Sequence, residues 1–225
     1  EAGQAAFVID CCIRRPFQER EVISVSFLQY LINGVSIGAV YAIIALGYTM
    51  VYGIAKMLNF AHGDVIMVGA YMSYSVTSYL GLPTVAGIAV AVLVCTLLGV
   101  LIEGLAYKPL RGVPSLAVLI TAIGVSYFLQ NAAQLVWGSA PKNFKSIVTM
   151  KPLVLFGGQL TITGEVIYTI VASVLIMVAL TLFINKSRMG KAMRAVSEDR
   201  AAAQLMGINV NQTISTTFAI GSALA

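Results

Sequence analysis

The fold of this chain is decided by an uncharged, apolar stretch, residues 65–102, which reads VIMVGAYMSYSVTSYLGLPTVAGIAVAVLVCTLLGVLI. A helix that crosses a bilayer needs about 20 predominantly apolar residues, so this stretch is long enough for two such helices. Gly81-Leu82-Pro83 divides it near its middle, because glycine and proline mark turns. We therefore expect two membrane-spanning helices, near 60–80 and 84–107.

Four further stretches also lack Asp, Glu, Lys and Arg: 22–55, 112–141, 166–185 and 201–225. They predict spans near 25–50, 116–137 and 165–185, with a sixth that begins near residue 213. The sequence thus predicts an all-α, polytopic integral membrane helical bundle with about six spans. Because residues 222–225 still lie inside an apolar run, we expect the sequence to be truncated within its last helix.

The composition supports a membrane protein and excludes several other classes. Of the 225 residues, 59% are hydrophobic and 10% are charged, and the mean hydropathy is +0.89. Soluble domains are about 25% charged, so neither a soluble enzyme nor a disordered tail fits. The net charge of +5 is not arranged as a basic and aromatic soluble face, and we expect no nucleic acid to bind.

Basic residues follow two of the expected spans and predict their orientation. Lys108 and Arg111 follow the third span, and residues 186–200 after the fifth contain five Lys or Arg. Short loops rich in Lys and Arg face the cytoplasm, and two spans separate these loops, so we expect both on that side. Three arginines within residues 1–20 favour the same side, although three crossings would place residue 1 opposite; this conflict stays open.

The chain offers no set of residues for catalysis, a metal ion or a cofactor. Cys11 and Cys12 are adjacent and Cys95 lies within a span, so they form no disulfide framework, and His62 is the one histidine. Gly190-Lys191 is followed by Ala192, which does not fit a nucleotide-binding loop. If ATP drives this protein, another polypeptide must bind it.

Polar side chains inside the apolar stretches are candidates for a translocation path, because such groups are costly in a membrane. The candidates are Asn33, Asn59, His62, Asp64, Gln130 and Asn131. Each has a structural alternative, since an amide can also bond across helices. Gly34 and Gly38 beside Asn33 form a G-x-x-x-G pair, which favours close helix packing.

The segment 59–64 and the carboxylate Glu103 each need a separate interpretation. Residues 59–64 can break the helix and line a cavity, or form an interfacial turn in which Asn59 or Asp64 caps the next helix. Glu103 at the end of the third span is interpreted as a structural carboxylate at the membrane boundary.

The loop at residues 186–212 contains the pattern of a short helix. Ser197 is a good N-cap, Glu198 and Asp199 place negative charge at the positive end of the helix dipole, and Gly207 fits the position after its end. A helix over 198–206 is too short to persist alone in water. It needs a docking partner, and this favours a peripheral subunit that delivers force to the membrane part over a solvated connector. The residues expected to matter in this 186–212 loop are Gly190, Ser197, Glu198, Asp199, Ala202, Leu205, Met206 and Gly207.

Several blocks of the chain resemble a known family. They are Leu31-Ile32-Asn33-Gly34 with residues 45–54, Asn59-Phe60-Ala61-His62-Gly63-Asp64, residues 102–111, residues 121–131, and residues 187–192 with 198–199 and 206–209. Over about residues 27–225 the chain is similar to the permease subunits of bacterial ATP-binding-cassette importers for branched-chain amino acids. We assign residues 25–225 to a transmembrane permease domain and residues 1–24 to a segment outside it.

This resemblance implies a non-catalytic permease of the bacterial inner membrane that contains no cofactor. Its expected partners are a second permease subunit, two cytoplasmic ATP-binding subunits, a periplasmic solute-binding protein, the amino acid substrate and the lipid bilayer. The 186–212 loop looks like the family's ATPase-docking segment. Gly104 stands where an Arg is common in the family, so a charge pair with Glu103 at that position is in doubt.

Other functions remain as alternatives at this stage. The same architecture could carry urea or short amides, because the permease sequence does not name its solute. An ion-coupled secondary transporter could use His62, Asp64 and Glu103. A membrane scaffold is disfavoured by the polar groups within the spans, and a membrane enzyme by the missing catalytic set.

Overall fold

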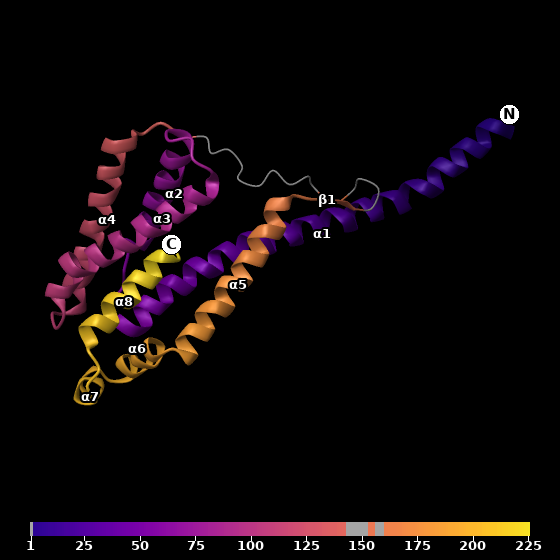
Figure 1. Cartoon of the computed structure of the whole chain (residues 1–225). Helices are drawn as coiled ribbons and strands as arrows, with labels where there is room; N and C mark the ends of the chain where they lie inside the picture. Colours follow the sequence, from indigo (N-terminus) through magenta and orange to yellow (C-terminus); the bar gives the residue numbers. More distant parts are fainter. Residues whose placement is uncertain (1, 143–152, 156–159) are drawn as a thin grey trace. The chain divides into compact units, whose positions relative to one another are not determined.

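The computed structural model describes residues 2–142, 153–155 and 160–225 of the chain (Figure 1). The chain divides into two compact units, each described by itself. Unit 1 comprises residues 1–41 and 148–175, and unit 2 comprises residues 42–147 and 176–225. The described part confirms the all-α class, and its strands form a single small hairpin.

Unit 1 contains the first part of a long helix, α1 (Ala2–Ala55), and the start of α5 (Gly164–Lys186). Between them lie the antiparallel strands β1 (Leu153–Leu155) and β2 (Leu160–Ile162). Their register pairs Leu153 with Ile162 and Leu155 with Leu160.

Unit 2 holds the helices that carry most of the polar residues of interest. They are α2 (His62–Ser78), α3 (Thr84–Ile102), the π-helical turn η1 (Glu103–Tyr107), the 3-10 turn η2 (Lys108–Leu110), α4 (Ser115–Trp137), α6 (Arg188–Glu198), α7 (Arg200–Leu205) and α8 (Val210–Ala223). The last residues of α1 and α5 also belong to it. Proline stands directly before both α3 and α4, at Pro83 and Pro114, where its fixed φ and missing N–H suit a helix start.

The expected spans correspond closely to the observed helices. Among the described residues, four segments are long and apolar enough to cross a membrane by length and composition: Ser26–Ala55, Thr84–Leu110, Leu116–Trp137 and Gly164–Lys186. Helices α2 and α8 stand where the two remaining spans were predicted, but they are shorter, with 17 and 14 residues. Gly81 at the predicted break has a φ of +65°, a backbone conformation that glycine adopts without steric cost.

The core of unit 2 forms where α3 packs against α2 and α8. Fully buried side chains here include Val51, Val65, Tyr107, Ile214 and Phe218. The helices approach closely because their contact positions are small. A Cβ on Gly99 would lie 2.0 Å from the Ser222 Oγ, and a Cβ on Gly47 would lie 3.0 Å from the Gly221 carbonyl oxygen.

The G-x-x-x-G pair predicted to bring helices together does not do so among the described residues. A Cβ on Gly34 or Gly38 would meet no heavy atom within 4 Å. The close glycine contact lies further along α1, where Gly47 meets Gly221 of α8. Spacing alone could not distinguish these positions, since Gly34, Gly38 and Gly47 are all small residues within the same apolar helix.

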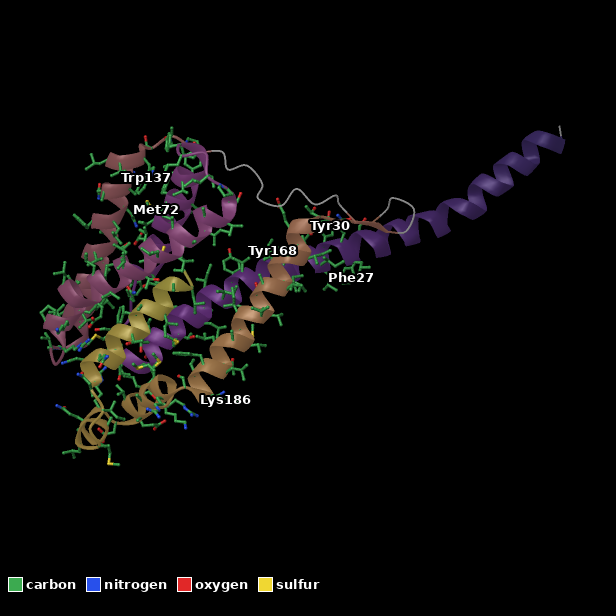
Figure 2. All side chains as sticks on the ribbon, in the orientation of Figure 1. Phe27, Tyr30, Met72, Trp137, Tyr168 and Lys186 are labelled. Carbon is green, nitrogen blue, oxygen red and sulfur yellow. The ribbon has the colours of Figure 1, made fainter. Side chains whose placement is uncertain are left out.

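Large apolar side chains cover much of the outer surface, as expected for a protein whose solvent is lipid. Phe27 and Tyr30 on α1 and Tyr168 on α5 are all more than half exposed, and Figure 2 shows Tyr168 near one end of α5 and Lys186 at the other. Aromatic and basic side chains typically anchor spans at the membrane–water interface.

Candidate functional site

The polar segment 59–64 spans the end of the α1–α2 connection and the first residues of α2 in unit 2. Helix α1 ends at Ala55, Lys56 has a φ of +53°, and α2 begins at His62. The capping alternative for this segment is wrong, because Ala61 precedes α2 and no side chain caps the helix. The side chains of Asn59 and Asp64 instead reach other helices.

Asn59 and Asp64 are both held from outside their own segment. The buried Asn59 Oδ1 accepts a hydrogen bond of 3.0 Å from the Tyr107 hydroxyl group, and the Asp64 Oδ1 accepts one of 3.0 Å from the Gln130 Nε2. The Gln130 Nε2 also lies 3.2 Å from the Ser126 Oγ. The structure therefore brings two of the predicted path residues, Asp64 and Gln130, into direct contact.

His62, the first residue of α2, is buried in the same region. Its ring contacts Tyr48, with 6.0 Å between ring centroids. Its Nε2 is buried and has no hydrogen-bond partner among the described residues. A Cβ on Gly47 would lie 3.3 Å from the His62 Cε1, so glycine at that position makes room for the ring.

The two remaining path candidates are not part of this group. Asn131 Nδ2 donates a hydrogen bond of 2.7 Å to the Tyr127 carbonyl oxygen of its own helix, and its side chain is exposed. Asn33 is exposed and belongs to unit 1.

A buried polar cluster ties the end of α3 to α8. Glu103 is 1% exposed and forms an ion pair with Arg111, and its Oε2 accepts a hydrogen bond of 2.6 Å from the Ser215 Oγ. Arg111 also donates to the Asn211 Oδ1. Glu103 thus has a structural role, as predicted, but it lies in the interior rather than at a solvated boundary.

The short helix predicted over residues 198–206 is present as α7, Arg200–Leu205, but its predicted N-cap, Ser197, is wrong. A separate helix, α6, precedes it and ends at Glu198. Ser187 caps α6, which continues to Glu198 because Gly190, Met193 and Val196 bury one face of it. Ser197 therefore lies in the last turn of α6, where its Oγ donates to the Arg194 carbonyl oxygen.

Asp199 is the N-cap of the second helix, α7. Its Oδ1 accepts hydrogen bonds of 2.8 and 3.2 Å from the N–H groups of Ala201 and Ala202. The prediction for Gly207 is confirmed. It has a φ of +81°, and its N–H bonds to the Gln204 carbonyl oxygen while that of Ile208 bonds to Ala203, as in a Schellman motif.

The tip of the 186–212 loop presents apolar side chains. Leu205 is 89% exposed and Met206 is 83% exposed, and Ala202 is exposed beside them. At the other end of α7, Arg200 donates a hydrogen bond to the carbonyl oxygen of Ala55, the last residue of α1. Figure 1 shows α6 and α7 at the end of unit 2 where α8 begins. The loop is thus linked to the end of a spanning helix.

Residues 30–225 match the family described as branched-chain amino acid transport system, permease component. The chain belongs to this permease family. It is 44% identical over 212 residues to the high-affinity branched-chain amino acid transport system permease protein BraD of Pseudomonas aeruginosa, covering 88% of this chain and 68% of that protein.

Other relatives of this permease carry similar names. It is 43% identical over 211 residues to the high-affinity permease protein LivH of Escherichia coli K12, covering 88% of this chain and 68% of that protein. A probable branched-chain amino acid permease protein of Methanocaldococcus jannaschii is 28% identical over 191 residues, covering 81% and 59%. No solved structure matches the chain. Together with the apolar helices, the family identifies a membrane permease subunit.

Sequence reasoning missed several polar contacts of this permease. Tyr107, Arg111, Ser215 and Arg200 bond to partners that are 48, 8, 112 and 145 positions away. Only the Glu103–Arg111 pair lies close enough in sequence for the charges to have suggested it. In the described ranges no group of three or more His, Cys, Asp or Glu residues is arranged to hold a metal ion.

Proposed function

We propose that this chain is the membrane-spanning, non-catalytic subunit of an ATP-driven importer for branched-chain or related amino acids. The solute would be delivered by a periplasmic binding protein, and the subunit would work in a bacterial inner membrane. Its partners would be a second permease subunit and two cytoplasmic ATP-binding subunits. The names of the relatives BraD and LivH support the solute class.

The observation that carries the proposal is the exposed apolar tip of the 186–212 loop. Leu205 and Met206 project almost fully exposed from a short helix that is capped at both ends. Exposed apolar side chains at such a tip favour a groove on a partner protein. We assign this tip to the contact with an ATP-binding subunit.

Two structural links would transmit a movement of α7 to the membrane-spanning helices. Arg200 holds the carbonyl end of α1, close in sequence to Asn59, which bonds to Tyr107. The 186–212 loop leads directly into α8, which the cluster of Glu103, Arg111 and Ser215 binds to the end of α3. A displacement of α7 would therefore bear on α1, α3 and α8 together.

The polar groups of unit 2 are proposed to lie along the solute path. Asp64 and Gln130 form a hydrogen-bonded pair between α2 and α4. Asn59 lies on the α1–α2 connection, and His62 is the first residue of α2. Asn131 and, from unit 1, Asn33 are further candidates, because each is an exposed amide within an apolar helix. Intramembrane polar side chains commonly mark such paths.

The experiment that tests the proposal is uptake of radiolabelled leucine by cells carrying the chain with residues 197–207 deleted. We expect uptake to be abolished while the amount of protein in the membrane is unchanged. Unimpaired uptake in the deletion would refute the proposed ATPase contact. Uptake that stops with an uncoupler while ATP is preserved would refute ATP-driven transport, and competition by urea but not by leucine would refute the solute class.

A further inference from the structure

A cavity of about 640 Å³ lies in unit 2 where α7 turns into α8. Its walls come from α7, from residues 207–209, from the first turn of α8 and from Arg111. A water molecule takes up roughly 30 Å³, so the cavity has room for a group much larger than a few waters.

The charge of this cavity is positive. Its lining contains the guanidinium groups of Arg111 and Arg200 and no Asp or Glu. The charge of Arg111 is balanced by its ion pair with Glu103. Arg200 forms no ion pair among the described residues and donates to the carbonyl oxygen of Ala55. The carboxylate of Asp199, next to Arg200 in sequence, is instead occupied with the N–H groups of Ala201 and Ala202.

Hydrogen-bond donors without an acceptor belong to residues that line this cavity. The Arg111 Nε is buried and has no partner among the described residues. The N–H groups of Val210 and Asn211 precede the first intrahelical bond of α8, from the Thr213 N–H to the Asn209 carbonyl oxygen. The first N–H groups of a helix have no intrahelical acceptor and carry the positive end of its dipole.

These observations together describe a binding site for an oxyanion. We propose that the cavity binds a phosphate-class anion, with Arg111 and Arg200 supplying charge and the first turn of α8 supplying N–H donors. Guanidinium groups bind such anions with paired hydrogen bonds, and a helix N-terminus adds further donors. The phosphate can come from the headgroup of an anionic lipid or from free phosphate, and the chemistry of the cavity is the same for both.

The matched variants for a test are Gln204→Glu and Asn185→Asp, each of which turns an amide into a carboxylate. Gln204 lines the cavity, whereas Asn185 lies on α5 and does not, and both side chains are exposed. The same negative charge is therefore added inside and outside the cavity without disturbing buried residues. A thermal melt of each variant checks that both fold as the unmodified chain does.

The measurement is native mass spectrometry of the purified full chain with phosphatidylglycerol, with zwitterionic phosphatidylcholine, or with inorganic phosphate. We expect the bound fraction of phosphatidylglycerol to exceed that of phosphatidylcholine and to fall about fivefold in Gln204→Glu, as a nearby like charge predicts, but not in Asn185→Asp. Displacement of the lipid by millimolar phosphate would assign the site to free phosphate, and retention would assign it to the headgroup. Equal binding of both lipids with no phosphate bound, or equal loss in both variants, would overturn the proposal. So would a Gln204→Glu variant that weakens only association with an ATP-binding subunit, since the cavity would then receive a partner's acidic side chain.

Discussion

At the scale of single residues, several buried polar groups of unit 2 are paired with side chains of other elements. Glu103 is paired with Arg111 and Ser215, and Asn59 with Tyr107. A buried charge without a partner is strongly unfavourable, so these contacts bind α3 to its neighbours and leave few alternative arrangements.

The Glu103–Arg111 pair predicts a large loss of stability when one partner is removed. Glu103→Gln leaves the guanidinium group of Arg111, whose side chain is 14% exposed, without its counter-charge. We expect a cost of about 3–5 kcal/mol, which lowers the thermal midpoint of the detergent-solubilised chain by about 10 °C. Glu198→Gln is the control, because Glu198 is exposed. Equal midpoints for the two variants would contradict this account of the cluster.

The packing at Gly99 gives a second prediction at the residue scale. In Gly99→Ala the added methyl group would overlap the Ser222 side chain, whereas in Gly124→Ala it would meet no atom within 4 Å. Overpacking costs about 1–3 kcal/mol, while alanine in an open helical position is favoured by about 1 kcal/mol. Thermal unfolding should therefore show a lower midpoint for Gly99→Ala and an unchanged or higher one for Gly124→Ala. The reverse order would show that α3 and α8 do not pack as described.

At the scale of elements, the helices could be predicted from sequence far better than their connections. The charge-free stretches predicted the helices, because backbone hydrogen bonding in lipid forces long apolar runs into helices. Gly81 and Pro83 predicted the break between the end of α2 and the start of α3. The boundary inside the 186–212 loop could not be predicted, since Ser197 and Asp199 are both good caps. The burial of Met193 and Val196 decided between them, and burial depends on the tertiary structure.

The assignment of Asp199 as the cap of α7 is testable by hydrogen exchange. Asp199→Ala removes the acceptor for the N–H groups of Ala201 and Ala202. Loss of an N-cap costs about 0.5–2 kcal/mol, so the amides of α7 should exchange about 2- to 30-fold faster, and Asp199→Asn should restore most of the protection. Ser197→Ala is the control and should change α7 little. Faster exchange in Ser197→Ala than in Asp199→Ala would instead support Ser197, the cap predicted from the sequence.

At the scale of the whole molecule, the long-range contacts of the candidate site lay beyond sequence reasoning. The residue types Asn59, His62, Asp64 and Gln130 were apparent as polar groups in apolar surroundings, and two of them, Asp64 and Gln130, do meet. Arg200 hydrogen-bonds to the last carbonyl oxygen of α1. This contact depends on the tertiary path of the chain after α5, and no local sequence pattern predicts that path. This contact makes the 186–212 loop part of the membrane structure rather than a loose connector.

The central claim is that α7 connects this permease to an ATP-driven partner, and Leu205 offers the most direct measurement. Leu205→Glu places a charge on the exposed apolar tip, where docking would bury it without a counter-charge, and Gln212→Glu adds the same charge elsewhere. The measurement is ATP-dependent leucine uptake by proteoliposomes containing the chain with its proposed ATP-binding, second permease and solute-binding partners. We predict that Leu205→Glu lowers uptake at least about tenfold while Gln212→Glu retains it. Full uptake in Leu205→Glu, or uptake that proceeds without ATP, would contradict the claim.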